Sequence, residues 1–151
     1  MLSMQPIGYV RSAYRDVRDI PKGLGAQHEA EGTLEILPEF EPGLLDVEGF
    51  SHLYVIWAFD RAEGCNLVVT PPTDDHPHGV FATRSPRRPN PIGLTVVQSI
   101  GREGSVIRVR GIDMLDGTPI LDIKPYLSNI PQEHLRRGWL AEAERRAATK
   151  P

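Results

Sequence analysis

The segment at residues 79–94 (GVFATRSPRRPNPIGL) holds the side chains with the clearest capacity for binding chemistry. Three arginines, Arg84, Arg87 and Arg88, lie in it without an acidic residue among them. Arginine presents a planar set of donors that matches carboxylates and phosphates. The prolines restrict the backbone, which lowers the entropy lost when a ligand fixes the loop. The segment therefore predicts a preorganised anion-binding loop, and the alternative is a solvated basic loop.

In a second polar segment, residues 113–126 (DMLDGTPILDIKPY), the two acids Asp116 and Asp122 lie near Lys124 in a run broken by Gly and Pro. A turn of this kind can present backbone groups to a ligand, and Asp116 or Asp122 could hold a hydroxyl or an amine. In the alternative, Asp116 only bonds its own backbone in a tight turn. Lys124 has the alternative of a charge at a strand edge.

Two further segments are less specific. Asp60 and Arg61 follow an apolar run, where a charged pair forms either the rim of a site or the solvated end of a strand. The loop at residues 20–28 contains Gly23 and Gly25, which invites comparison with dinucleotide-binding loops. We reject that comparison, because His28 stands where the third glycine would be and no strand–helix–strand unit follows.

The histidines do not predict a metal site. Asp74, Asp75, His76 and His78 alternate in a loop, but a further strong ligand is not evident from the sequence. The only cysteine, Cys65, has no evident activating partner. We therefore expect neither a bound metal nor a cysteine nucleophile.

The elements that position these side chains are mostly predicted strands. The 14 Pro and 14 Gly favour short strands joined by turns. Alternating or continuous apolar runs predict strands at residues 7–14, 32–37, 50–59, 67–70, 80–82, 94–100, 105–111 and 120–123. Residues 50–59 are almost continuously apolar, which predicts a strand covered on both faces. From residue 131 onward, Leu135, Trp139, Leu140 and Ala143 recur at helical spacing.

These patterns predict a mainly β fold, a small antiparallel barrel with a C-terminal helix. The length of 151 residues suits one domain with a hydrophobic core. We expect a barrel domain at residues 1–128 and a helical extension at residues 129–151.

Composition points to a soluble cytoplasmic protein. One cysteine allows no intramolecular disulfide, as expected in a reducing compartment. Neither a leader pattern nor an apolar run of membrane-spanning length is evident. The net charge of -3 argues against nucleic-acid binding through the overall field, but it allows a local basic patch.

Four motifs together resemble the TrmO (TsaA-like) family of tRNA methyltransferases. They are residues 7–12 (IGYVRS), 47–53 (VEGFSHL), 79–85 followed by 88–93 (GVFATRS and RPNPIG), and 116–119 followed by 122–126 (DGTP and DIKPY). The likeness spans nearly the whole chain up to the helix. Departures are Pro21-Lys22-Gly23, where the family usually has Pro-Arg-Gln, and Arg87, where an aromatic is frequent.

The resemblance implies a small antiparallel barrel that forms a homodimer, with S-adenosyl-L-methionine bound near the subunit interface. It implies N6-methylation of threonylcarbamoyladenosine beside the anticodon of tRNA. The cofactor contacts it implies are Pro21, Lys22, Gly23, Asp60, Arg61, Arg84, Leu94, Asp116, Gly117, Thr118 and Pro119.

A mechanism consistent with the resemblance gives these residues separate tasks. Arg84 or Lys22 would bind the cofactor's carboxylate, and Leu94 with the turn at residues 116–119 would bind its adenine. Asp116 or Asp122 would accept the proton of the methylated nitrogen. The phosphates of the anticodon loop would be bound by three basic residues, Arg87, Arg88 and Lys124. Two alternatives stay open: a methyltransferase for another RNA or a small metabolite, and a module that holds the cofactor without catalysis.

Overall fold

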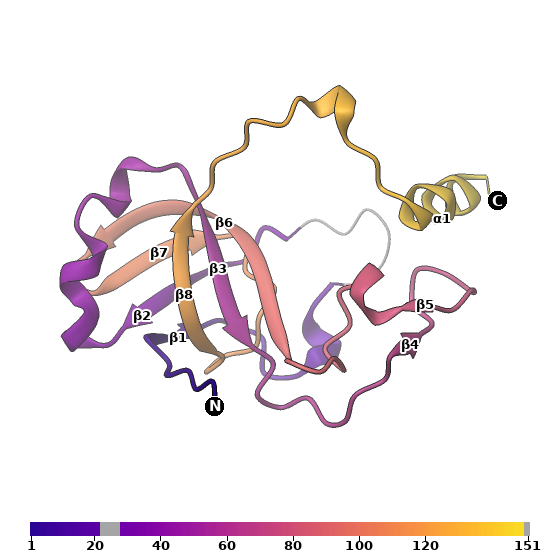
Figure 1. Ribbon diagram of the computed structural model, residues 1–151. Coiled ribbons are helices and arrows are strands. Elements are labelled where there is room, and N and C mark those ends of the chain that lie inside the picture. The colour runs from indigo at the N-terminus through magenta and orange to yellow at the C-terminus, as the bar shows by residue number, and fades with distance from the viewer. Residues whose placement is uncertain (22–27, 150–151) are drawn as a thin grey trace.

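Six strands close into an antiparallel barrel in the computed structural model, which describes residues 1–21 and 28–149 (Figure 1). Their order around the barrel is β1-β2-β7-β6-β3-β8. The strands are β1 (Gly8–Arg11), β2 (Glu31–Ile36), β3 (His52–Ala58), β6 (Ile92–Glu103), β7 (Val106–Arg110) and β8 (Pro119–Pro125). The predicted mainly β barrel is confirmed.

Alternation of side chains along each strand builds the core. On β6, Thr95 and Val97 are buried inside the barrel, while Leu94 and Val96 are exposed outside it. Successive side chains of a strand point to opposite faces, so a closed barrel buries only every second residue completely. The expectation that residues 50–59 are covered on both faces is therefore wrong, since the outward side chains of β3, such as Tyr54, are only half-buried.

The interior is filled by branched and aromatic side chains from all six strands and from the turn that precedes β8. The fully or almost fully buried members are Val10, Leu34, Ile36, Leu44, Leu53, Val55, Trp57, Val97, Ile107, Val109, Ile112, Met114 and Ile120. Trp57 has room because its register partner on β6 is Gly93, where a Cβ would lie 2.3 Å from the indole ring.

Two short predicted strands form other structures. The prediction that residues 67–70 continue the main sheet is wrong, because β4 (Val68–Val69) pairs only with β5 (His78–Gly79) in a separate two-stranded sheet. Residues 80–82 form the 3-10 helix η4 (Val80–Ala82) instead of a strand. The other 3-10 helices are η1 (Val17–Asp19), η2 (Pro38–Leu44), η3 (Val47–Gly49) and η5 (Gln132–His134).

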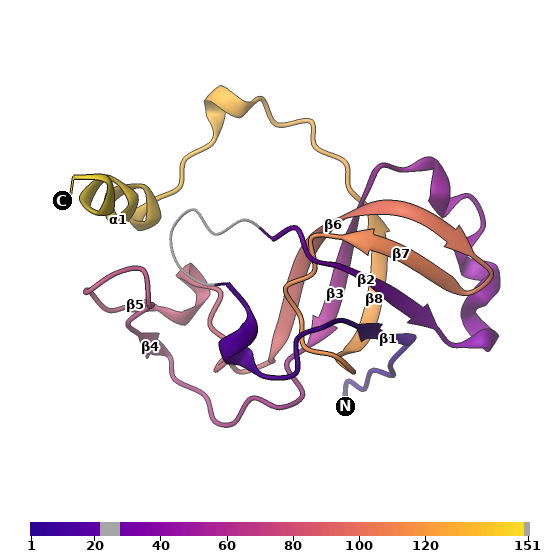
Figure 2. The ribbon, with the colours of Figure 1, turned by 180° about the vertical axis from the view of Figure 1, so that it is seen from behind.

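The C-terminal helix α1 (Trp139–Ala148) begins later than its apolar spacing predicts, so that Leu135 lies before it. Residues 126–138 leave the end of β8 and arch away from the barrel to reach α1 (Figures 1 and 2). Apolar side chains on this arch, Leu127, Ile130 and Leu135, are exposed. No helix among the described residues has both the length and the apolar character needed to cross a bilayer.

Helix α1 is attached to the segment that contains β5 and η4. The Trp139 indole stacks on the His78 ring at 4.3 Å, and its Nε1 donates to the Ala82 carbonyl at 2.8 Å. Arg146 Nη2 lies 2.5 Å from Oδ1 of Asp74, whose side chain is only 2% exposed. His78 Nε2 lies 2.6 Å from the other oxygen of Asp74, and this hydrogen bond lowers the pKa of Asp74 below its usual range.

We expect Arg146→Ala to loosen α1 without unfolding the barrel, because it removes the charged partner of a buried carboxylate. Hydrogen exchange should become faster at residues 139–148 and stay unchanged in β3 and β6. Arg145→Ala is the matched control, since within the described part of the chain Arg145 pairs with Glu142 of its own helix and with no other acid. Because attachment lowers the pKa of Asp74, the contribution of this carboxylate should be fully present above its ordinary pKa of 3.8 and be lost progressively as the pH falls below that value. Equal exchange in both variants would contradict this role.

Candidate functional site

The arginine loop between η4 and β6 is held by its own hydrogen bonds. Arg88 Nη1 donates to the carbonyls of Thr83 and Ser85, both at 3.1 Å, and the Thr83 hydroxyl donates to the Val80 carbonyl at 2.8 Å. The predicted loop is therefore ordered, and Arg88 has a structural task within it. Within the described residues, the guanidinium groups of Arg84 and Arg87 have no hydrogen-bond or ion-pair partner, so both are available to an anion.

Arg84 borders a cavity of about 320 Å³ at the open side of β6. Sequence segments that are far apart meet at this cavity. One wall residue precedes β2, one lies in the arginine loop, three lie on β6 and two follow β7. The lining residues are His28, Arg84, Leu94, Thr95, Val96, Gly111 and Asp113. Of the predicted cofactor contacts, the cavity brings together Arg84 and Leu94.

A chain of two hydrogen bonds runs from the core to this cavity. Trp57 Nε1 donates to Thr95 Oγ1 at 3.0 Å, and the Thr95 hydroxyl donates to Asp113 Oδ1 at 2.6 Å. The indole N–H can only donate, so the direction of both bonds is fixed. The orientation of the Asp113 carboxylate is therefore set from inside the barrel.

His28 lines the cavity and also holds an unsatisfied polar atom. Its Nδ1 is buried and has no hydrogen-bond partner among the described residues. A buried donor or acceptor left unpaired costs about 1–3 kcal/mol.

The turn at residues 113–119 gathers a second group of predicted contacts. Ser12 N donates to Asp116 Oδ1 at 3.1 Å, and Arg61 Nη2 donates to the Asp116 carbonyl at 2.5 Å. Gly117 has a φ of 84°, and a Cβ there would lie 3.2 Å from Arg61 Nη2. Arg61 and the predicted turn are therefore in contact, and Asp60 lies beside Arg61, with 4.0 Å between Asp60 Oδ1 and Arg61 Nε.

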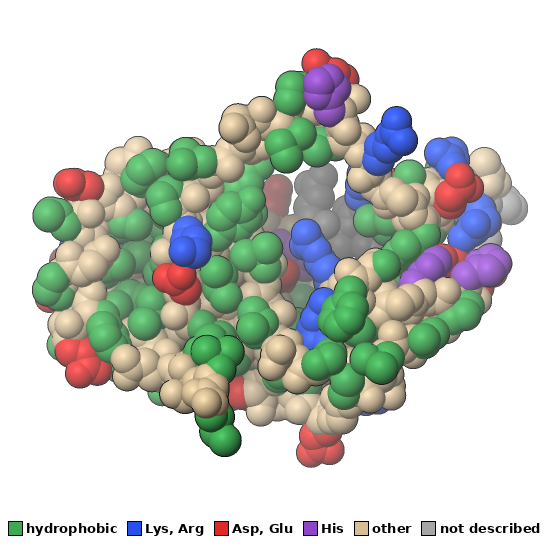
Figure 3. All heavy atoms as spheres, in the orientation of Figure 1, with side chains coloured by type: hydrophobic (Ala, Val, Ile, Leu, Met, Phe, Trp, Pro, Cys, Tyr) green, Lys and Arg blue, Asp and Glu red, His purple; other side chains and the backbone are tan. Residues whose placement is uncertain are grey.

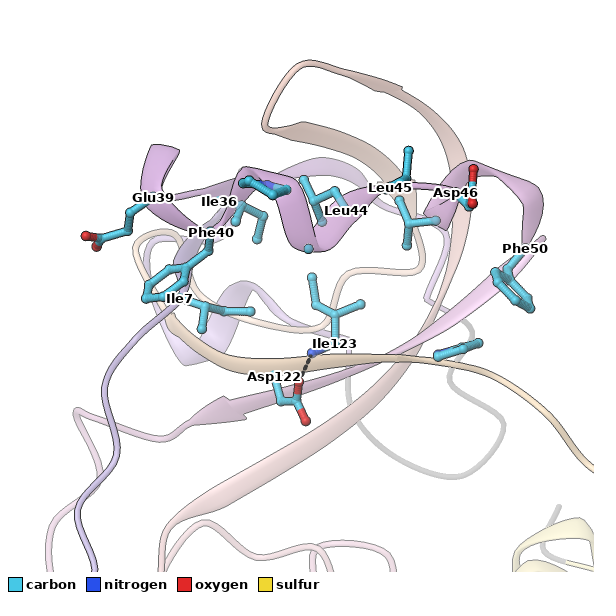
Figure 4. A pocket seen from close by; sticks show the side chains of 14 residues that line it. Ile7, Ile36, Glu39, Phe40, Leu44, Leu45, Asp46, Phe50, Asp122 and Ile123 are labelled. Carbon is cyan, nitrogen blue, oxygen red and sulfur yellow. Dashed lines mark hydrogen bonds between the residues drawn. The ribbon is translucent and has the colours of Figure 1, made fainter.

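Asp122 and Lys124 lie on β8, away from the Arg84 cavity. Lys124 Nζ is 3.3 Å from Asp122 Oδ2, so the two charges pair with each other. Asp122 borders a larger cavity of about 520 Å³ under η2, lined mainly by apolar side chains (Figure 4). In Figure 4 Ile123 is directed toward Leu44, while the Asp122 carboxylate lies on the other side of β8.

The remaining predicted contacts are in the loop before β2. Pro21 is exposed. Lys22 and Gly23 lie outside the described residues, so their placement relative to Arg84 stays a prediction.

The Asp74 cluster could offer three metal ligands. Donor atoms of Asp74, Asp75 and His76 lie within 4.8 Å of one another. Asp74 already accepts a hydrogen bond from Arg146, however, and this guanidinium places a positive charge where a metal would have to lie. We therefore assign the cluster to the attachment of α1.

Comparison with known proteins places the chain in a family. Residues 9–132 match the model of the tRNA-methyltransferase O N-terminal domain. The chain belongs to this TrmO family. It is 47% identical over 141 residues to a probable S-adenosyl-L-methionine-binding protein of Pyrococcus abyssi, covering 93% of this chain and 77% of that protein.

More distant matches agree on the family. A crystal structure of TrmO superposes with a TM-score of 0.75 and 40% identity, covering 92% of this chain and 64% of that one. The human tRNA (adenine(37)-N6)-methyltransferase is 37% identical over 134 residues, which is 84% of this chain and 30% of the human protein. The chain thus spans less than two thirds of the TrmO chain and of the human enzyme.

Sequence reasoning missed His28, Thr95 and Asp113 as members of the site. Thr95 offers a usable signal, because it is a polar residue at an inward position within the otherwise apolar run 92–97 of β6. The sequence marks Asp113 only as the start of a turn. His28 offers no signal of its own, since its role depends on the cavity that β6 and the chain after β7 build beside it.

Proposed function

We propose that this chain binds S-adenosyl-L-methionine in the Arg84 cavity and is a methyltransferase acting on tRNA. The observation that carries the proposal is the juxtaposition, around one cavity, of Arg84, which has no partner among the described residues, of His28 and Asp113, and of an apolar wall from Leu94 and Val96. This combination suits a ligand with charged and apolar parts. The names of the relatives, a probable S-adenosyl-L-methionine-binding protein and a tRNA methyltransferase, support the same conclusion.

The residues present fit this cofactor. Arg84 is placed to bind its carboxylate through paired hydrogen bonds. Leu94 and Val96 offer an apolar surface, and the turn at residues 116–119, which Arg61 holds, would lie against the adenine. Pro21, Lys22 and Gly23 would add the further cofactor contacts that the resemblance implies. When bound, the cofactor supplies a methyl group on a positively charged sulfur.

We propose that the methyl acceptor is N6 of threonylcarbamoyladenosine beside the anticodon. The protein positions this nitrogen and receives its proton. Asp116 suits the proton better than Asp122, because its Oδ2 has only a distant partner, Arg15, at 4.0 Å. Asp122 is paired with Lys124 and lines the other cavity.

The RNA contacts we propose centre on Arg87, which is exposed and has no side-chain partner among the described residues. Arg88 supports it indirectly, because its guanidinium holds the loop backbone. Lys124 would add a phosphate contact from β8. Figure 3 shows basic side chains beside the hollow between the barrel and α1, as a local patch requires in a chain of net charge -3.

We further propose a homodimer formed through the outer face of β3 and β6. The register places Tyr54 opposite Val96 and Ile56 opposite Leu94, and Leu94 and Val96 are 49% and 40% exposed. Hydrophobic side chains cover much of the barrel face in Figure 3. Exposed apolar patches of this kind mark interfaces. A partner on this face would also cover the Arg84 cavity, whose wall includes Leu94 and Val96.

We propose a cytoplasmic location, where tRNA is found, with residues 1–128 as the catalytic domain and residues 129–151 as an extension. The free, exposed Cys65 is compatible with a reducing compartment.

Replacing Arg84 with Ala should weaken the binding of S-adenosyl-L-methionine by about 10- to 150-fold, the range expected for a lost hydrogen bond to a charged group. Isothermal calorimetry measures this directly. Arg108→Ala is the matched control, because Arg108 is an exposed arginine on β7, outside the cavity. Equal affinity in wild type and Arg84→Ala would remove the cofactor from this cavity.

Charge reversal at Arg87 should weaken tRNA binding while leaving cofactor affinity unchanged. Binding of the wild type should fall steeply with added salt, and Arg87→Glu should show a shallower salt dependence because one phosphate contact is lost. Filter binding at several salt concentrations checks both, with Arg108→Glu as control. If the methyl acceptor is not RNA, tRNA binding should be the same in the wild type and in both variants, and added salt should have little effect on it.

Val96→Glu should convert a dimer into a monomer, because it places a charge at the centre of the proposed apolar interface. Light scattering coupled to size exclusion measures the mass in solution. Arg108→Glu, on the outer face of β7, should stay dimeric. A monomeric wild-type protein, or a variant that stays dimeric, would contradict this interface.

A further inference from the structure

Three side chains of the Arg84 cavity each have a polar atom without a partner among the described residues, and they differ in charge. Arg84 is a cation, Asp113 a carboxylate, and His28 an imidazole with a buried, unpaired Nδ1. Arg84 and Asp113 form no ion pair with each other, although they line one cavity. A wall that carries an uncompensated cation and an uncompensated carboxylate is complementary to a ligand that carries both charges.

The carboxylate of Asp113 is prepared for such a ligand. The Thr95 hydroxyl must donate to Asp113 Oδ1, because Thr95 itself accepts from the indole of Trp57. Oδ1 is thereby used as an acceptor, and Oδ2 has no partner among the described residues. One oxygen is fixed by the core, and the other is left for a donor that enters the cavity.

The nature of that donor follows from charge. A phosphate or another anionic group of a ligand would be repelled by the Asp113 carboxylate. An ammonium group would instead form a charge-assisted hydrogen bond with it. An α-amino acid group carries an ammonium and a carboxylate on one carbon. Arg84 and Asp113 together satisfy both charges, which neither residue could do alone.

We propose that Asp113 binds the α-ammonium of the amino-acid end of S-adenosyl-L-methionine, while Arg84 binds its carboxylate. This assignment rests on the proposed cofactor site and adds a residue to it. Asp113 is thus a specificity residue that distinguishes ligands with an amino-acid end from adenine nucleosides without one. Thr95 is a positioning residue that acts through Asp113.

The test compares three ligands by calorimetry: S-adenosylhomocysteine, its desamino analogue, which lacks only the ammonium, and 5′-methylthioadenosine, which lacks the whole amino-acid end. With the wild-type protein, we expect the desamino analogue to bind about 10-fold more weakly than S-adenosylhomocysteine. With Asp113→Asn that difference should shrink to about twofold or less, because the amide cannot attract the ammonium as a carboxylate does. The amide oxygen of this variant can still accept from Thr95, so the fold is preserved. Affinity for 5′-methylthioadenosine should stay the same in both proteins.

Two further variants separate this role from a structural one. Glu103→Gln removes a carboxylate at the exposed end of β6 and should leave all three affinities unchanged. Thr95→Val removes the hydroxyl that fixes Asp113 and also leaves the Trp57 N–H without its acceptor, so its fold is first checked by thermal unfolding. The folded variant should show a smaller loss of the preference for the ammonium than Asp113→Asn.

The outcomes are distinct. Equal wild-type affinity for S-adenosylhomocysteine and its desamino analogue would overturn the assignment while leaving the cofactor site standing. An equal loss for all three ligands in Asp113→Asn would also overturn it, because it would show a structural effect. Absence of binding by the wild type to S-adenosylmethionine and to all three ligands would remove the proposed function, and the assignment with it.

Discussion

The buried indole N–H of Trp57 requires a hydrogen-bond acceptor inside the barrel, and the wall of the Arg84 cavity on β6 depends on how that requirement is met. A buried indole without a partner is costly, and the ring fits only because Gly93 opposite it has no side chain. The acceptor is Thr95, which is buried on the same strand as Gly93. The Thr95 hydroxyl in turn donates a hydrogen bond to Asp113. A packing need in the core thus fixes a carboxylate at the surface. Leu94 and Val96, the outward neighbours of Thr95, belong to the same cavity wall.

The rest of the cavity is supplied by segments that the barrel itself does not constrain. Arg84 lies on a proline-rich loop whose backbone is held by Arg88 and by hydrogen bonds of Thr83. The start of that loop is tied to α1, since Trp139 donates to the carbonyl of Ala82. Arg84 is therefore positioned from two directions, by its own loop and by the C-terminal helix. Site precision in this protein comes from a rigid strand on one side and a tethered loop on the other.

The strands of the barrel were predictable because their apolar residues follow the period of the sheet, and so was the arginine loop, whose composition serves no core. The 3-10 helix at residues 80–82 could not be distinguished from a short strand, because three residues are too few to show a periodic pattern of apolar side chains. The apolar spacing starts helix α1 too early because Leu135 continues it, although Gly138 with a φ of 55° precedes the first helical turn. His28 and Asp113 could not be assigned, since their meaning depends on tertiary contacts with β6 that no local pattern encodes.

Closure of the barrel places its first strand against its last. Gly8 of β1 lies opposite Ile120 of β8, and Ser12 bonds Asp116, which lies 104 positions further along the chain. During synthesis, no order of strand pairing can complete the sheet until nearly all the barrel has left the ribosome. Until then β1 has an unpaired edge, and strand edges of this kind recruit other chains. Contacts so distant in sequence also make folding slow. The architecture that gives the site its rigid wall therefore leaves the nascent chain with an unpaired strand edge until its final strand is made.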